Sequence, residues 1–410
     1  MRADAVHPRP RHTCPRGLSR RSSRGVSLIE LMVGLAIGLL AVLVIAQVAL
    51  VYEGRKRTVT ATSDAQVQGA LALQTLQRDV QAGGYGMTEG GSIRCRIEGL
   101  RADTPDAERF VRTLAPVVVI DGADGRPDSL EVLMSGHGDF ALPIRVASNH
   151  TRGAQSFVIS ANDNLGLRRG NLMLAVPVPT PEPDDGQRWC SLFNLSSDPV
   201  PGSGELPHAT GDAGPWNHDL TTSVFPGHLS TDLSYPAGSH LLSLGRLVSR
   251  RYCISGLGDA QCDNRSGDGS QRPTVALNLR QVSFDTDTGR YTAEDLFPQI
   301  VSLQAVYGHD TSTPADHIAD VWNAVPPRTG DAWRRVVAVR IALVARSANN
   351  ASRPDQGVTA VTATLPVCHP DGTTAEPIDV RTVIGDDWQQ YRYKVYEAVI
   401  PLRNVLWQPT

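Results

Sequence analysis

The stretch that decides how this chain folds reads Arg24-Gly-Val-Ser-Leu-Ile-Glu30-Leu-Met-Val-Gly34-Leu-Ala-Ile-Gly38-Leu-Leu-Ala-Val-Leu-Val-Ile-Ala-Gln47-Val-Ala-Leu-Val51. Residues 31–51 form an apolar run of 21 residues in which Gln47 is the single conventionally polar side chain. As a helix this run is roughly 31 Å long, which matches a hydrocarbon core of about 30 Å. A helix that is apolar on all faces has no side to turn to water, so the run predicts a membrane-spanning helix.

The residues before this run are strongly basic. The first 25 residues hold seven arginines and one acid, Asp4, and a basic region followed by an apolar one is the layout of an export signal. An ordinary secretory signal has only about 7–15 apolar residues and then a small-x-small cleavage site, and neither feature fits this run. The arginines outnumber the three cations at 55–57, so we expect a cytoplasmic N-terminus and an exported remainder.

Glu30 is unusual because a carboxylate at the start of an apolar helix is costly to desolvate. With the basic leader and Gly25, it resembles the prepilin signal of type IV pilins and pseudopilins. The resemblance implies cleavage between Gly25 and Val26 by a prepilin peptidase and N-methylation of Val26. It also implies that Glu30 pairs with the new amine of a neighbouring subunit.

Two observations qualify this resemblance. Ser27 and Glu30 also form an S-x-x-E capping box, so Glu30 has an alternative role as a helix-start carboxylate. Position 26 is Val, where the family usually has Phe.

The Gly34-x-x-x-Gly38 pair is either a helix-association face or a spacing without meaning, and the sequence leaves both interpretations open.

The helix is expected to continue beyond the membrane as far as residue 82, where Gly83 and Gly84 provide a C-terminal stop. Its amphipathic part, 53–82, has apolar residues three or four apart, with Asp79 expected largely outside this stripe. The stripe consists of Val59, Val67, Ala70, Leu71, Leu73, Leu76 and Val80. The predicted organisation is a cleaved leader (1–25), a membrane or fibre-packing helix (26–52), this continuation, and a periplasmic head (83–410).

The head is expected to be rich in antiparallel strands, which makes the fold class α+β: a long N-terminal helix packed on a large β-rich head. Gly 37 and Pro 28 together supply 65 of the 410 residues, which favours a loop-rich β protein. Ten prolines between residues 176 and 238 predict a long loop insertion there. The predicted strands are Val117–Ile120, Leu130–Met134, Ser156–Ile159, Leu172–Val178, Leu241–Val248, Val275–Leu279, Ile300–Tyr307, Val336–Ala345 and Tyr391–Ile400.

Three head segments, 293–310, 333–347 and 391–404, resemble PilW-type minor pilins of the type IV pilus. The resemblance implies a protein that primes pilus assembly and sits in a tip complex. The partners it implies are the prepilin peptidase, other minor pilins and the major pilin, a PilY-type tip adhesin and the inner-membrane assembly platform. Two alternatives are a J-type minor pseudopilin of a type II secretion system and a membrane-anchored exported enzyme. Glu30 argues against the enzyme, because a simple anchor has no use for an acid there.

Cysteine usage fits an exported head. Cys14 lies in the leader, and removing it leaves an odd number, Cys95, Cys190, Cys253, Cys262 and Cys368. Cys253 and Cys262 are nine residues apart around a Ser-Gly-Leu-Gly stretch, which predicts a disulfide loop in an oxidising compartment. A zinc site is disfavoured, because Cys368 adjoins His369 and no C-x-x-C accompanies them.

The sequence predicts no enzyme, cofactor or metal site, because common nucleophile, zinc-protease and nucleotide-binding motifs are absent in usable contexts. The acidic runs 121–128 and 285–289 are similar to calcium loops. Leu296, however, stands where an EF-hand starting at Asp285 needs its glutamate, so we expect hairpin turns. The formal net charge of −3 means that the chain has no overall excess of positive charge for binding phosphates, so no direct nucleic-acid binding is expected.

Overall fold

The computed structural model describes residues 27–87, 92–99, 110–136, 142–160, 166–178, 190–209, 215–217, 233–263, 277–347, 364–365 and 377–406. The chain divides into two compact units, residues 1–57 and residues 58–410, and each is described by itself. An N-terminal apolar helix precedes a large antiparallel β-rich region, which confirms the predicted α+β class.

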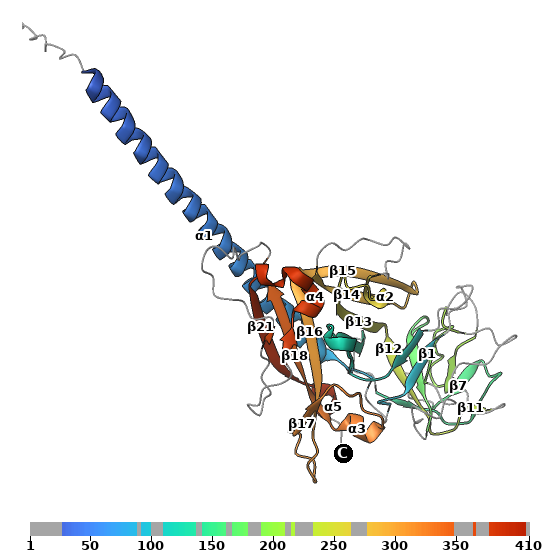
Figure 1. Cartoon of the computed structure of the whole chain (residues 1–410). Coiled ribbons are helices and arrows are strands. Elements are labelled where there is room, and N and C mark those ends of the chain that lie inside the picture. The colour runs from blue at the N-terminus through green and yellow to red at the C-terminus, as the bar shows by residue number, and fades with distance from the viewer. Residues whose placement is uncertain are drawn as a thin grey trace, which may run out of the picture. The chain divides into compact units, whose positions relative to one another are not determined.

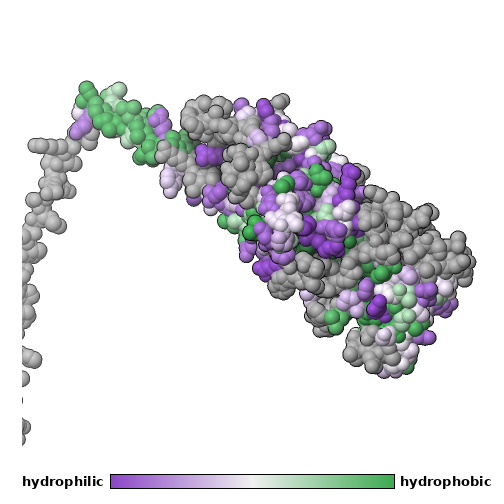
Figure 2. Space-filling model, turned by 90° about the horizontal axis from the view of Figure 1, so that it is seen from below, coloured by the Kyte–Doolittle hydropathy of each residue, from purple (hydrophilic) through white to green (hydrophobic). Residues whose placement is uncertain are grey.

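The long helix α1 (Leu28–Ala82) contains 55 residues and ends where the sequence predicts, directly before Gly83 and Gly84. Gly84 has a φ of 77°, a conformation that glycine adopts without steric cost and that commonly ends helices. Among the described residues, Leu28–Glu53 is long and apolar enough to cross a membrane, and its side chains are exposed. Figure 2 shows these residues as a patch of apolar surface.

Two antiparallel sheets form what we call the inner lobe of the second unit, together with the part of α1 after residue 57 (Figure 1). The five-stranded sheet has the order β15 (Arg290–Pro298), β14 (Asn278–Asp285), β13 (Leu247–Ile254), β4 (Ser129–Ser135) and β3 (Val117–Ile120). The four-stranded sheet has the order β17 (Val321–Asn323), β16 (Ile300–His309), β18 (Val336–Arg346) and β21 (Tyr393–Pro401).

A six-stranded sheet and two strand pairs form the outer lobe. The six-stranded sheet has the order β2 (Phe110–Thr113), β1 (Arg96–Gly99), β9 (Cys190–Asn194), β8 (Leu172–Val176), β12 (His240–Gly245) and β5 (Ile144–Arg145). The pairs are β10 (Glu205–Pro207) with β7 (Ser156–Val158) and β11 (Leu233–Tyr235) with β6 (His150–Thr151). Strands β1 and β9 pair in parallel, with Ile97 opposite Cys190.

Short elements complete the described fold. These are a further strand pair and several short helices: β19 (Thr364–Leu365) with β20 (Ile378–Asp379), η2 (Ala123–Gly125), α2 (Ala260–Asp263), α3 (Gly330–Arg334), α4 (Arg381–Ile384), η4 (Gly385–Gln390) and α5 (Arg403–Leu406).

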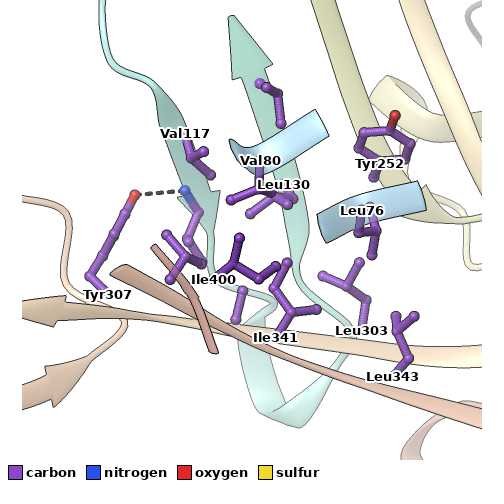
Figure 3. Packing of buried hydrophobic residues seen from close by; sticks show 14 of the residues in the cluster. Leu76, Val80, Val117, Leu130, Tyr252, Leu303, Tyr307, Ile341, Leu343 and Ile400 are labelled. Carbon is purple, nitrogen blue, oxygen red and sulfur yellow. Dashed lines mark hydrogen bonds between the residues drawn. The ribbon is translucent and has the colours of Figure 1, made fainter. Parts of the chain in front are cut away.

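The core of the inner lobe joins α1 to both of its sheets (Figure 3). Leu76 and Val80 of α1 are fully buried in one cluster with Leu130 of β4 and Ile341 of β18. Tyr307 is buried in the same cluster, and its hydroxyl oxygen accepts a hydrogen bond of 2.6 Å from the backbone N–H of Val119. Burying several large apolar side chains at about 1.5–3 kcal/mol each makes this cluster a major source of stability.

The outer lobe has a core on each face of its six-stranded sheet. Leu172 and Leu174 of β8 lie in one cluster, whereas Met173 and Ala175 lie in another, as the alternation of side chains along a strand requires. All five residues of β8 are therefore buried, and the strand is apolar throughout rather than at alternate positions.

The apolar stripe of α1 differs in part from the prediction. Val67 and Leu71 are 52% and 45% exposed, whereas Asp79 is 3% exposed. Gly69 lies on the buried side, where a Cβ would come within 2.3 Å of the Tyr396 ring of β21. The helix therefore buries small residues where an aromatic side chain approaches, and periodicity of large apolar residues does not detect such a surface.

The proline-rich range 176–238 is not simply a loop. Its described parts contain β9, β10 and β11, and the Trp216 side chain is only 1% exposed. Pro207 ends β10, a strand of a two-stranded sheet, which is a position that proline tolerates. The predicted strand 241–248 is also divided, into β12 and β13, at Gly245 with a φ of 60°.

A pair of buried histidines lies in the outer lobe. The Nε2 atoms of His150 and His208 are 2.9 Å apart, and the His150 ring stacks on Phe157 with centroids 3.9 Å apart. One nitrogen donates and the other accepts in such a contact, so at least the accepting ring must be neutral and the contact is lost when both rings are protonated. Burial lowers the pKa of His150 to about 4 and that of His208 to about 3.

These histidines predict that acid destabilises the protein. Because their folded pKa values lie below the ordinary 6.5, the unfolded chain binds more protons, and the free energy of unfolding falls as pH drops from 6.5 towards 4. Each histidine contributes about 1.4 kcal/mol per pH unit within this window. Urea unfolding of the full chain in detergent at pH 6.5 and pH 4.5 measures the loss, which we expect to be smaller in His208→Gln.

Asp128 acts in the opposite direction, since burial raises its pKa to about 7 and its contribution to stability grows as pH falls towards 4. It is present in both proteins, so the difference between them isolates His208. An identical pH dependence of the wild type and His208→Gln contradicts the prediction.

Candidate functional site

The N-terminal site lies on the exposed part of α1. Glu30 is in the first turn of the helix, and the N–H of Leu31 donates to the carbonyl of Ser27. Glu30, Gly34 and Gly38 are four residues apart and so lie along one face. A Cβ at either glycine would meet no atom within 4 Å, which leaves an open apolar notch there. Gly25 and Val26, the predicted cleavage and methylation positions, lie outside the described residues.

A buried carboxylate attaches α1 to the inner lobe. The Asp79 carboxylate accepts hydrogen bonds from Nη1 of Arg250, at 2.5 Å, and from the hydroxyl of Tyr252. Both partners are on β13, so they tie this strand to the last turn of α1. Burial, and next the hydrogen bond to Asp79, raise the pKa of Tyr252, so the phenol remains a donor. Sequence periodicity placed Asp79 outside the buried face and missed this clamp.

The C-terminal segment holds the same end of α1. The side-chain Nδ2 of Asn404 donates to the carbonyl oxygens of Ala82, at 3.3 Å, and of Gly83, at 2.8 Å. Leu402 is fully buried in the core of the inner lobe. The closing Leu-Arg-Asn triplet therefore inserts an apolar side chain and satisfies carbonyl groups that a helix end leaves without partners.

Two disulfides lie among the described residues of the head. One joins Cys253 to Cys262, the pair singled out from the sequence, with Cα atoms 6.1 Å apart. The other joins Cys95 to Cys190, with Cα atoms 5.8 Å apart and a sequence separation of 95. Sequence spacing could not identify this second pair, because its two halves meet only when β1 and β9 pair. Cys368 lies outside the described residues.

The acidic runs form turns in the structure. The Asp285 carboxylate accepts bonds of 2.9 Å from the N–H of Asp287 and the hydroxyl of Thr288, and so closes the hairpin between β14 and β15. The Asp128 carboxylate accepts from the backbone N–H groups of Gly122 and Ala305. Within the described part of the chain, no group of three or more His, Cys, Asp or Glu side chains is arranged to hold a metal ion.

Two family models match this chain. Residues 20–46 match the prokaryotic N-terminal methylation motif, and residues 265–404 match the Type IV Pilus-assembly protein W family. The first match covers the predicted cleavage positions, Gly25 and Val26, and the start of α1. The second covers the four-stranded sheet with β14 and β15. Most of the outer lobe lies outside both matches. No curated protein sequence matches the chain.

Together these matches relate the chain to the type IV pilus and support its assignment to the pilin-like proteins. More particularly, its head contains a PilW-type region and its N-terminus carries a prepilin-like signal, as the sequence resemblance predicts. Both matched families are structural components of pilus assembly, and the apolar helix and the methylation motif fit a membrane-anchored pilin.

The Asp79 clamp supplies a test of how α1 is attached. Replacing Asp79 by Ala leaves the Arg250 guanidinium and the Tyr252 hydroxyl without their shared acceptor, so we expect a loss of about 2–4 kcal/mol in the free energy of unfolding. Urea unfolding of the full chain in detergent measures this loss. The matched control is Gln74→Ala, at an exposed position of the same helix, whose loss should stay within about 0.5 kcal/mol. Equal losses in the two variants contradict the role of the clamp.

Proposed function

We propose that this chain is a PilW-like minor pilin that helps to prime assembly of a type IV pilus and sits in its tip complex. The observation that carries the proposal is the presence of both matches in one chain, the methylation motif at 20–46 and the PilW family at 265–404. A J-type pseudopilin shares the N-terminal processing, but the match at 265–404 favours the pilus.

The proposed mechanism begins with processing on the cytoplasmic side of the inner membrane. A prepilin peptidase cleaves between Gly25 and Val26, and the new amine of Val26 is methylated. The apolar run of α1 begins after this cut, so the mature protein keeps its membrane helix. The Glu30 carboxylate then neutralises the amine of a neighbouring subunit, because an ion pair is strong in the low dielectric of packed helices.

The head is proposed to act on the periplasmic side by binding proteins, without catalysis. The partners are other minor pilins, the major pilin, a PilY-type tip adhesin and the inner-membrane assembly platform. The Asp79 clamp and the hydrogen bonds of Asn404 support this role, because they fix the part of α1 after residue 57 in one position on the inner lobe. A head held in this way offers partners a defined surface at little entropic cost.

Mass spectrometry of the N-terminal peptide tests the processing step. We expect a chain that starts at methylated Val26 in cells with the prepilin peptidase and a chain that starts at Met1 without it. The reason is that the leader lies before the membrane helix and is accessible from the cytoplasm. A start at Met1, or after residue 51, in cells that contain the peptidase contradicts the proposal.

Replacing Glu30 by Gln tests the assembly step separately from processing. The variant should still be cleaved at Val26, but its incorporation into pili should fall by at least about tenfold, which corresponds to about 1.4 kcal/mol of lost pairing. Immunoblots of sheared pili measure incorporation. Glu53→Gln, at an exposed carboxylate further along the same helix, is the matched control and should incorporate normally. An equal loss in both variants contradicts a specific role of Glu30.

A further inference from the structure

The two disulfides follow a simple order along the chain. Cys95 is joined to Cys190 and Cys253 is joined to Cys262, so each bond links a cysteine to the next cysteine in the sequence. Cys368 lies outside the described residues. The four described cysteines allow three connectivities, and the structure contains the one made of consecutive pairs. Cys14 precedes the proposed cleavage site and does not enter the exported chain.

The four disulfide-bonded cysteines that the structure describes are inaccessible in the folded head. Cys95, Cys190 and Cys262 are 0% exposed and Cys253 is 1% exposed. Cys95 and Cys190 lie in the core shared by the outer lobe and β4, where Leu133 contributes to the same cluster. A protein oxidant needs direct access to a thiol, because exchange proceeds by attack of a thiolate on a disulfide sulfur. These cysteines must therefore be oxidised before the head has folded around them.

The pairing of strands places a second constraint on the order of events. Cys95 directly precedes β1, and Cys190 begins β9, which pairs with β1 in parallel. Parallel strands need a long crossover, so this contact forms late unless something else brings the two segments together. A disulfide between the starts of both strands does so, because it closes the loop while the chain between them is still unfolded.

We propose that this head is oxidised sequentially during export by a periplasmic thiol oxidase, each cysteine pairing with the next one to emerge, and that it needs no disulfide isomerase. The inference rests on the proposed function. In it the apolar part of α1 stays anchored in the membrane, and the rest of the chain emerges from the membrane in sequence order, beginning at residue 58. In each step two thiols lose two protons and two electrons, and one sulfur–sulfur bond forms. The oxidase's own disulfide takes up the electrons and becomes a dithiol.

Cells that lack either the thiol oxidase or the disulfide isomerase provide the first test. Free thiols in the full chain are alkylated, and mass spectrometry then measures the peptides linked through Cys95–Cys190 and Cys253–Cys262. We expect both bonds at the wild-type level without the isomerase and both thiol pairs reduced without the oxidase. Wild-type chains that need the isomerase for Cys95–Cys190, or that form it without the oxidase, overturn the proposal.

An added cysteine tests the sequential order directly. Ser148→Cys inserts an exposed thiol between Cys95 and Cys190, whereas Val325→Cys inserts one at a 63% exposed position after Cys262. Without the isomerase, Ser148→Cys should lower the Cys95–Cys190 bond at least about twofold, because the inserted thiol reaches Cys95 first. Val325→Cys should leave this bond unchanged. Equal effects of the two insertions overturn the sequential order.

The N-terminal mass of the same samples separates this inference from the proposed function. Cleavage occurs on the cytoplasmic side, so a start at methylated Val26 is expected whether or not the oxidase is present. A Val26 start with reduced Cys95 and Cys190 in wild-type cells refutes sequential oxidation and leaves the pilin assignment standing. A Met1 start in the presence of the peptidase refutes the pilin assignment itself.

Discussion

The burial of one face of α1 in the inner lobe is the constraint on which the rest of the head depends. Leu76 and Val80 complete a core to which the five-stranded and four-stranded sheets both contribute. Asp79 lies between them in sequence and is buried with Arg250 and Tyr252 as its donors. An apolar face alone permits a helix to slide or rotate, whereas a buried carboxylate with two fixed donors is satisfied in one position.

The C-terminal end of the same helix is held by the C-terminal segment of the chain. Asn404 donates to the carbonyl oxygens of Ala82 and Gly83, and Leu402 fills the core beside them. The final strand β21 also contacts α1, where the Tyr396 ring lies over Gly69. The PilW match includes these C-terminal residues, so it covers the segment that receives the helix rather than a surface remote from it.

The outer lobe is stabilised by different interactions from those of the inner lobe. Its six-stranded sheet has apolar side chains on both faces, and a disulfide joins the starts of the parallel strands β1 and β9. A neutral pair, His150 and His208, lies in one of its two cores. These features tie the stability of the lobe to pH and to thiol oxidation, two conditions that differ between the cytoplasm and an exported compartment.

The sequence alone determined the features that depend on local pattern. The length of the apolar run predicts the membrane helix, the glycines at 83 and 84 predict its end, and the nine-residue spacing singles out Cys253 with Cys262. Strands with strong β-branched runs, such as β3, β16 and β18, were also predicted within a few residues. In each case the physical signal lies within one short segment.

Only the tertiary structure decided the contacts between distant segments. Periodicity predicts that Asp79 lies on the surface, whereas its burial depends on donors 171 and 173 positions away. The disulfide of Cys95 with Cys190 depends on strand pairing across 95 residues, and the strands at 190–194 and 205–207 lie in a proline-rich range whose composition favours loops. Local composition records the preference of a segment, whereas burial and pairing depend on the segments that pack against it.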